Sequence, residues 1–202
     1  MTARVSAILL PVLVLWQSAA PIAAQSIPAA DEGVLIVRSA GRVVGREEFA
    51  LRRVTDARGR NGLTLSAIST YPPADPIRTL VRFAPRRVTV RLATATGEAA
   101  REYPTAGRYI IADDSVFALF VLAADGVPGP VRVYLPRSGR RVSGTLEDFG
   151  LQPTALGQEI RELRHLVLRI EGRLHHLWYD TAGRLMKVAV PARDVVAERR
   201  LR

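Results

Sequence analysis

The sequence predicts a mainly β protein, in which a strongly curved antiparallel sheet (a half-barrel) of about ten short strands wraps around one short apolar helix. Three observations predict this fold. Short segments in which apolar residues alternate with Arg, Thr or Glu recur along the chain, and Gly and Pro separate them. One stretch of nine residues, 116–124, has no polar side-chain atom. Period-two segments are typical of strands with one buried and one solvated face, so we expect them to cover the apolar stretch.

Residues 1–24 are predicted to be a secretory signal peptide. Arg4 is followed by an apolar run from Val5 to Trp16, and small residues precede a cut that we place after Ala24. The run is shorter than the ~20 residues that span a bilayer, so no stable membrane span is expected after cleavage. We therefore expect an exported protein, periplasmic or secreted. The remaining chain is divided into a flexible lead at 25–33 and a single half-barrel domain at 34–202.

Charge and cysteine content narrow the class of protein. The formal net charge is +10, and +9 without Arg4. The basic residues are almost all Arg, since Lys187 is the only Lys, and they are spread along the chain rather than clustered. This distribution favours a solvated basic surface, with weak contact to anionic surfaces through Arg, over a nucleic-acid site. The chain has no Cys, so packing without disulfides must hold the fold.

The first half of the domain reads as a series of strands. A β-branched run at 34–37 is followed by a turn and a returning strand at 43–53, and residues 56–62 have the composition of a loop. An alternating segment at 63–71 ends where three prolines, Pro72, Pro73 and Pro76, prevent further pairing.

The clearest strand signal lies at 78–84 and 87–94. Val88, Val90 and Leu92 alternate with Arg87, Thr89 and Arg91, and only Pro85 and Arg86 separate the two segments. These segments are therefore predicted to form an antiparallel pair with one buried face. Shorter strands are expected near 99–103 and 108–112.

The apolar stretch at 116–124 is interpreted as a short helix, with a buried strand as the alternative. Asp113, Asp114 and Ser115 precede it, which is the composition of a helix N-cap. Ala and Leu favour the helix, whereas Val and Phe also suit a sheet. Periodicity does not decide between the two, because every position in the stretch is apolar.

The C-terminal part is expected to form further strands at 131–135 and 140–146 and then consecutive hairpins. A two-residue turn at Glu171-Gly172 pairs Ile170 with Arg173 and Leu168 with His175. A four-residue turn at 180–183 pairs Leu177 with Met186 and His175 with Val188. In this register one face is apolar, and the other carries His165, His176, Asp180 and Lys187, with Trp178.

No catalytic, metal or cofactor motif stands out. Two histidines with Asp180 could in principle bind a metal, but adjacent residues of a strand point to opposite faces, so His175 cannot join His176. Glu47 and Glu48 face opposite sides for the same reason. No Ser lies in a Gly-x-Ser-x-Gly elbow, and no Gly-rich phosphate loop precedes a helix. We therefore predict no enzyme activity, no metal and no cofactor.

The C-terminal stretch resembles a group of uncharacterised exported bacterial proteins. The residues that carry the resemblance are Gly172, then Trp178, Asp180, Gly183, Arg184 and Leu185 in a Trp-x-Asp-x-x-Gly-Arg-Leu hairpin, then Pro191 and Glu198-Arg199. That group is similar in outline to the LolA-like periplasmic fold, a half-barrel around helices whose concave side can hold acyl chains. The resemblance covers about the last 90 residues. The chain departs from lipoprotein carriers in having one short helix in place of a long helical plug.

Two functions follow from these observations. The first is a non-catalytic exported envelope protein that binds a hydrophobic or amphiphilic, lipid-like ligand on the concave side of the sheet. The residues expected to line that site are Phe83, Val88, Val90, Leu92, Phe117 and Phe120. The alternative is a scaffold or interaction domain with a filled core and a basic outer surface that meets an acidic partner.

Overall fold

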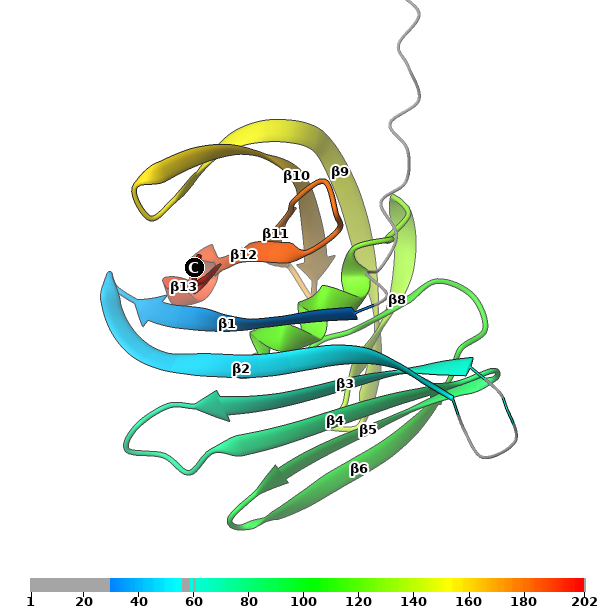
Figure 1. Ribbon diagram of the computed structural model, residues 1–202. Helices are drawn as coiled ribbons and strands as arrows, with labels where there is room; N and C mark the ends of the chain where they lie inside the picture. Colours follow the sequence, from blue (N-terminus) through cyan, green and yellow to red (C-terminus); the bar gives the residue numbers. More distant parts are fainter. Residues whose placement is uncertain (1–29, 56–58, 60, 202) are drawn as a thin grey trace, which may run out of the picture.

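The computed structural model describes residues 30–55, 59 and 61–201, and these residues form one sheet of thirteen strands with a short helix inside it (Figure 1). The strands are β1 (Ala30–Ser39), β2 (Arg42–Thr55), β3 (Asn61–Thr70), β4 (Ile77–Ala84), β5 (Arg87–Thr94), β6 (Gly97–Pro104), β7 (Tyr109–Ile111), β8 (Gly129–Leu135), β9 (Arg140–Leu156), β10 (Glu159–Ile170), β11 (Arg173–Tyr179), β12 (Leu185–Val190) and β13 (Val195–Arg199). The 3₁₀ helices are η1 (Phe117–Ala123) and η2 (Pro191–Arg193).

The sheet is strongly curved but not closed by hydrogen bonds. Its order is β6-β5-β4-β3-β2-β1-β13-β12-β11-β10-β9-β8-β7, and every pairing is antiparallel except β7 with β8. The predicted mainly β architecture around a short apolar helix is confirmed, but the predicted count of about ten strands is wrong. One unpredicted strand is β13, which sits between β1 and β12 in a segment that reads as a tail after Pro191.

Tyrosine side chains join the two edge regions of the open sheet. The rings of Tyr103 on β6 and Tyr134 on β8 stack with 4.2 Å between centroids. The Tyr134 hydroxyl donates a hydrogen bond to the carbonyl of Pro104 at 2.9 Å, and the Arg141 guanidinium lies 5.6 Å from the centre of the Tyr103 ring. The barrel-like shape is therefore completed here by side chains instead of backbone pairing.

Helix η1 fills the interior of the curved sheet (Figure 1). It begins after Val116, which makes no side-chain capping bond, so the predicted capping by Asp113, Asp114 and Ser115 is wrong. The first free N–H groups are satisfied from across the barrel. Both oxygens of Glu47, on β2, accept these bonds, from Phe117 at 3.0 Å and from Ala118 at 2.7 Å. A long-range carboxylate thus replaces the local cap.

Strands β9 and β10 extend beyond the barrel as a long hairpin that arches over the outer side of β11–β13 (Figure 1). The pairing shifts between Arg164 and Leu166, and Gly150 has a φ of 71°, a conformation that favours glycine at this bend. Beneath the arch is a second small core. Its members are Leu156, Leu163 and Met186, with Trp178 and Leu201 packed against them. Because β9 continues through Pro153 to Leu156, it extends well beyond the strand predicted at 140–146.

The C-terminal register was predicted correctly at one turn and wrongly at the next. Ile170 pairs with Arg173, and Leu168 with His175, as predicted. In the second hairpin Leu177 pairs with Val188 instead of Met186, since the register shifts after Trp178. That shift moves Met186 away from the main core and into the core beneath the arch.

The N-terminal boundary also differs from the prediction. Strand β1 begins at Ala30, so residues 30–33 of the predicted flexible lead are paired with β2. The rest of that lead and the predicted signal peptide, with its cut after Ala24, lie outside the described residues. No helix in the described part of the chain is long and apolar enough to cross a membrane.

Candidate functional site

Five of the six predicted ligand-binding residues lie inside the packed core. Val88, Val90 and Leu92 on β5 are at most 2% exposed, and so are Phe117 and Phe120 of η1. All five belong to the continuous apolar cluster between the sheet and η1. The structure does bring these residues together, but it packs them against one another. Phe83, near the end of β4, is the exception and is only partly buried.

An apolar pocket of about 230 Å³ opens at the end of the barrel where η1 ends, and we call it the apolar end pocket. Phe83 lines it, and so does Leu122, the one residue of η1 that is not fully buried. Tyr109, Val131 and Leu146 form other parts of its wall. The Tyr109 ring also stacks on Tyr134, with 5.4 Å between the ring centroids. The accessible part of the predicted ligand surface is therefore at this end of the barrel.

A few polar groups surround the apolar end pocket. Burial raises the pKa of the Asp125 carboxyl, against the opposing charge of Arg164. Burial likewise raises the pKa of Tyr109 to about 12, so its hydroxyl stays protonated at physiological pH. The Arg108 guanidinium donates a hydrogen bond to the carbonyl of Pro128 at 2.9 Å. This combination of apolar walls and few polar groups is typical of sites for small hydrophobic molecules.

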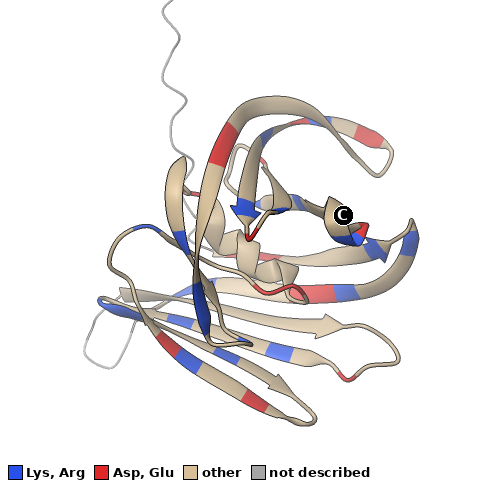
Figure 2. Ribbon diagram, turned by 180° about the vertical axis from the view of Figure 1, so that it is seen from behind, with Lys and Arg blue, Asp and Glu red and all other residues tan. Residues whose placement is uncertain are grey.

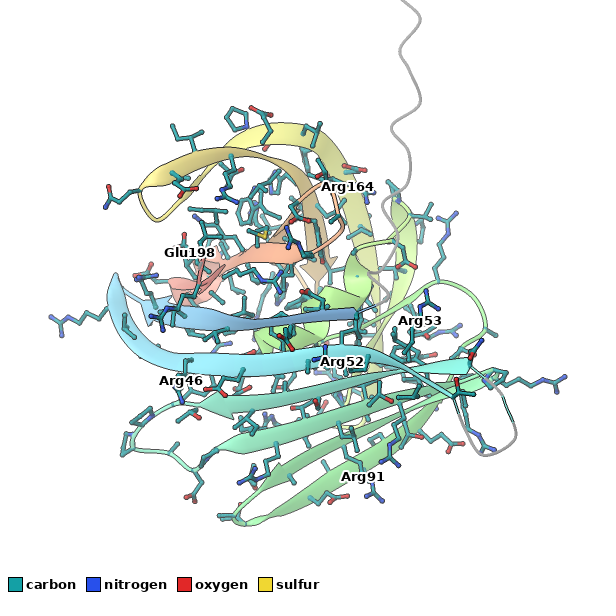
Figure 3. The ribbon with its side chains drawn as sticks, in the orientation of Figure 1. Arg46, Arg52, Arg53, Arg91, Arg164 and Glu198 are labelled. Atoms are coloured by element: carbon teal, nitrogen blue, oxygen red, sulfur yellow. The ribbon has the colours of Figure 1, made fainter. Side chains whose placement is uncertain are left out.

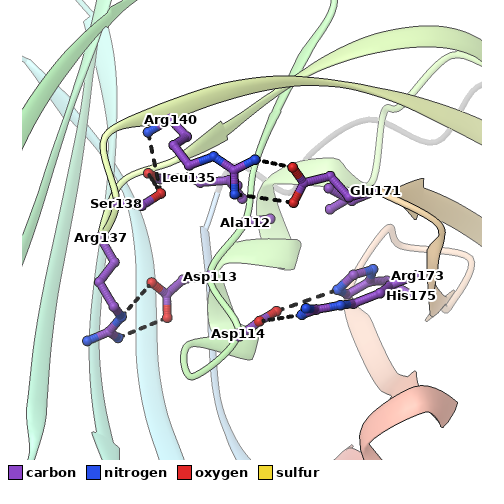
Figure 4. A pocket seen from close by; sticks show the side chains of 11 residues that line it. Ala112, Asp113, Asp114, Leu135, Arg137, Ser138, Arg140, Glu171, Arg173 and His175 are labelled. Carbon is purple, nitrogen blue, oxygen red and sulfur yellow. Dashed lines mark hydrogen bonds and ion pairs between the residues drawn. The ribbon is translucent and has the colours of Figure 1, made fainter.

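The opposite end of the barrel has a charged pocket of about 310 Å³, which we call the charged end pocket (Figure 4). Arg137 makes a two-pronged ion pair with Asp113, at 2.9 and 3.1 Å. Arg173 pairs with Asp114 at 3.2 Å, and Arg140 pairs with Glu171. Figure 4 shows these pairs around the rim of the pocket, with the loop before η1 at its base.

The ion pairs of the charged end pocket hold the loop that leads into η1. Each guanidinium group of the pocket is already matched with a carboxylate, and two of those carboxylates belong to the loop that leads into η1. His175, at 4% exposure, packs against Phe120, and burial lowers the pKa of its imidazole. The Ser138 hydroxyl donates to the Leu135 carbonyl at 3.4 Å. These contacts hold the loop but place no activated nucleophile in the pocket.

The other two histidines meet on the outer face of the sheet, as the predicted register requires. Nε2 of His165 lies 2.9 Å from Nδ1 of His176, and Nδ1 of His165 lies 2.9 Å from the side-chain oxygen of Gln152. The His165 ring also stacks on Trp178 with 4.7 Å between centroids. Asp180 instead binds Arg184 and the turn between β11 and β12. Among the described residues, no group of three His, Cys, Asp or Glu could hold a metal ion.

Two charged residues inside the barrel were missed by the sequence reasoning. Glu47 is fully buried, and Arg164 is 4% exposed. For Glu47 the signal was available, because it alternates with Phe49 and Leu51 and so belongs to the buried face of β2. Arg164 likewise lies two residues before Leu166 and four before Leu168 on β10, so the alternation along this strand points all three side chains to the buried face.

Fold and pockets together define a mainly β, open barrel-like domain with a filled interior. No family model matches the chain. No curated protein matches it either. Among solved structures, it is similar to a beta-barrel-like protein of the domain of unknown function DUF1849 from Brucella abortus, with 10% identity and a TM-score of 0.42. That match covers 87% of this chain and 96% of the other. The fold described above stands on the strand pairing alone, and the resemblance to the LolA-like fold stays a prediction.

Proposed function

We propose that this chain is a non-catalytic exported envelope protein that binds a hydrophobic or amphiphilic ligand at the apolar end pocket. One observation carries the proposal. Phe83 is the only predicted ligand residue that is not fully buried, Leu122 is the only such residue of η1, and both line the same pocket. In the described part of the chain the concave surface is otherwise covered by the core, and this end offers an apolar entrance.

The geometry of the pocket sets the kind of ligand. Its walls come from the hydrophobic inner sides of β4, β7, β8 and β9, and its mouth carries Arg108 and Asp125. An alkyl segment suits the walls, and a polar head suits the mouth. With a volume of about 230 Å³ the pocket takes one short chain segment rather than a complete pair of acyl chains.

The test is binding of the fluorescent apolar probe N-phenyl-1-naphthylamine to the mature chain. Leu122→Trp adds an indole where the pocket is open and should weaken binding by about tenfold, which corresponds to about 1.4 kcal/mol. Ile68→Trp is the matched control, because Ile68 is 39% exposed on the outer face of β3. Equal probe affinity in wild type and Leu122→Trp would overturn the proposal. Native mass spectrometry of protein from a bacterial envelope tests for a co-purifying lipid.

A scaffold or interaction domain is the second candidate, and the filled interior favours it. The five core residues named above pack as any structural core would, and most of the Arg side chains lie on the outside. In that case wild type and Leu122→Trp would both fail to bind the apolar probe, no lipid would co-purify, and the outer surface would carry the function.

A further inference from the structure

The outer face of the sheet wing formed by β2–β6 carries several arginines, and two of them, Arg78 and Arg82, form no ion pair with the described residues. Arg78 and Arg82 lie on the outer face of β4, four residues apart, and Arg91 on β5 pairs with Leu80 between them. Four residues of a strand span about 13 Å, and diagonal neighbours in a sheet lie about 7–8 Å apart. Arg78, Arg82 and Arg91 therefore form a triangle, which we call the arginine triangle.

Pairing with carboxylates does not neutralise this face. Across the outer rows of β2–β6 the basic residues are Arg46, Arg52, Arg78, Arg82, Arg87 and Arg91. The acidic ones are Glu48, Glu98 and Glu102. Four of the six arginines are paired with carboxylates: Arg46 with Glu48, Arg52 with Glu32 on β1, Arg87 with Glu102 and Arg91 with Glu98. Among the residues that the structure describes, Arg78 and Arg82 have no carboxylate partner. Figure 2 shows blue basic segments on successive strands of this wing, and Figure 3 labels Arg46, Arg52 and Arg91 on it.

A shallow groove of about 670 Å³ runs along one end of the same face. Arg82 and Arg87 line it together with the hydroxyl groups of Thr64 and Thr89 and the carboxylate of Glu102. Its apolar part is formed by Val54, Phe83, Ala84 and Pro85. Thr64, Arg82 and Thr89 lie in one cross-strand row, so cationic and hydroxyl groups alternate across the sheet. Arg82 and Arg91 are diagonal neighbours across β4 and β5, so an anion bound between them would reduce their mutual repulsion.

We propose that the arginine triangle and this groove bind a linear anionic polysaccharide. The guanidinium groups match the acid groups of the polymer, and the hydroxyls match its sugar hydroxyls. A lipid bilayer fits less well, since the large apolar residues exposed on this part of the face, Ile68 at 39% and Val54 at 43%, lie far apart: Ile68 is opposite Glu48, six positions before Val54 on β2. A nucleic acid would need several exposed aromatic rings for base stacking, and the groove is lined by one aromatic ring, that of the partly buried Phe83. The groove shares Phe83 with the apolar end pocket, but none of the three arginines of the triangle lines that pocket, so the two proposals can be tested separately.

The test compares two double variants of equal net charge. Arg78→Gln/Arg82→Gln should weaken binding of polygalacturonate by about fivefold, as expected for two solvated charge contacts, and the binding should fall with added salt. Arg42→Gln/Arg132→Gln is the matched control, because both residues are exposed arginines outside this face. The control should bind within about twofold of wild type, and neutral dextran should not bind.

Three outcomes would overturn the proposal. Equal loss in both double variants would mean that net charge alone attracts the polymer. Absence of polygalacturonate binding by wild type would remove the site. Binding to vesicles of phosphatidylglycerol, lost in Arg78→Gln/Arg82→Gln while polygalacturonate does not compete, would assign the face to a membrane. Because the residues are exposed, thermal unfolding of all variants should match wild type, and Leu122→Trp should leave polygalacturonate binding unchanged.

Discussion

The two ends of η1 are held by buried charges of opposite sign, and the comparison between them explains how the barrel keeps its interior filled. At the start, Glu47 accepts the free N–H groups of Phe117 and Ala118. At the end, Arg164 donates to the carbonyls of Ala124 at 2.9 Å and Gly126 at 3.3 Å. An anion at the N-terminal end and a cation at the C-terminal end both suit the partial charges of a helical segment.

The two anchors differ in how their own charge is compensated. Arg164 has Asp148 as a counter-ion, at 2.8 and 3.0 Å. The hydrogen-bond donors to Glu47 are neutral: two backbone N–H groups and the hydroxyl of Tyr71 at 2.5 Å. Burial raises the pKa of Glu47 in spite of these bonds. The end of η1 is therefore fixed by a complete ion pair, whereas its start depends on a carboxylate whose charge is costly to keep.

Removing the cation at the end of η1 should have the largest effect. Arg164→Met keeps most of the side-chain volume but leaves Asp148 without its partner and two carbonyls unsatisfied. Loss of one member of a buried pair predicts a decrease of about 3–5 kcal/mol in the free energy of unfolding, measured by urea denaturation. Arg173→Met is the control, since Arg173 is 56% exposed in its pair with Asp114 and should cost under about 1 kcal/mol. Equal losses in the two variants would contradict the role of Arg164 as an anchor.

Removing the anion at the start of η1 should cost slightly less. Glu47→Ala leaves two backbone N–H groups and the Tyr71 hydroxyl without an acceptor, but it also removes an uncompensated buried charge. We expect a loss of about 3 kcal/mol in the free energy of unfolding. The adjacent Glu48→Ala provides the control, because Glu48 is half exposed and pairs with Arg46 on the surface. Glu48→Ala should change stability by under about 0.5 kcal/mol. A loss that small in Glu47→Ala would mean that solvent reaches the start of η1.

Two tyrosine hydroxyls, one bonded to Glu47 and one to the backbone of η1, allow a comparison with smaller expected effects. The Tyr71 hydroxyl donates to the Glu47 carboxylate, and the buried Tyr179 hydroxyl donates to the Phe120 carbonyl at 2.7 Å. Bonds to a charged group are stronger. At a pH above the raised pKa of Glu47, Tyr71→Phe should therefore cost about 2 kcal/mol and Tyr179→Phe about 1 kcal/mol in urea unfolding. The reverse order would show that Glu47 carries little charge in the folded protein.

The same contrast shows what the sequence could and could not predict. Alternation in 78–84 and 87–94 identified β4 and β5 and their buried faces correctly, since each side chain there depends only on period two. The anchors of η1 are different, because Glu47 lies 70 positions before Phe117 in the chain. Local composition pointed to Asp113 and Asp114 as the cap, but both carboxylates bind arginines instead. Partners that distant are fixed by the curvature of the whole sheet.

The candidate site was predicted in part for a related reason. Residue patterns separate the inner from the outer face, and all six predicted ligand residues do face the interior or its end. Residue patterns do not show which part of the interior is filled by side chains, because the filling depends on how η1 packs against β5. The sequence therefore predicts Phe83 as a ligand-binding residue together with five residues that are buried in the core. The bend at Gly150 and the register shift after Trp178 likewise have no period-two signal.

The pH dependence of stability distinguishes the Glu47 end of η1 from the Arg164 end, and we expect this effect to be the smallest of those predicted. Since burial raises the pKa of Glu47 above its ordinary value of 4.5, the folded protein keeps this proton at pH values where the unfolded chain releases it. The stability contributed by this proton is full below the ordinary pKa and is lost as the pH rises through the folded pKa.

Glu47→Gln cannot titrate, and its amide resembles the protonated carboxyl. Wild type should therefore lose stability relative to Glu47→Gln as the pH rises from about 4 to 7, measured by urea unfolding at each pH. If wild type gains on the variant instead, the hydrogen bonds from Tyr71, Phe117 and Ala118 outweigh desolvation, and the two ends of η1 are equally well compensated.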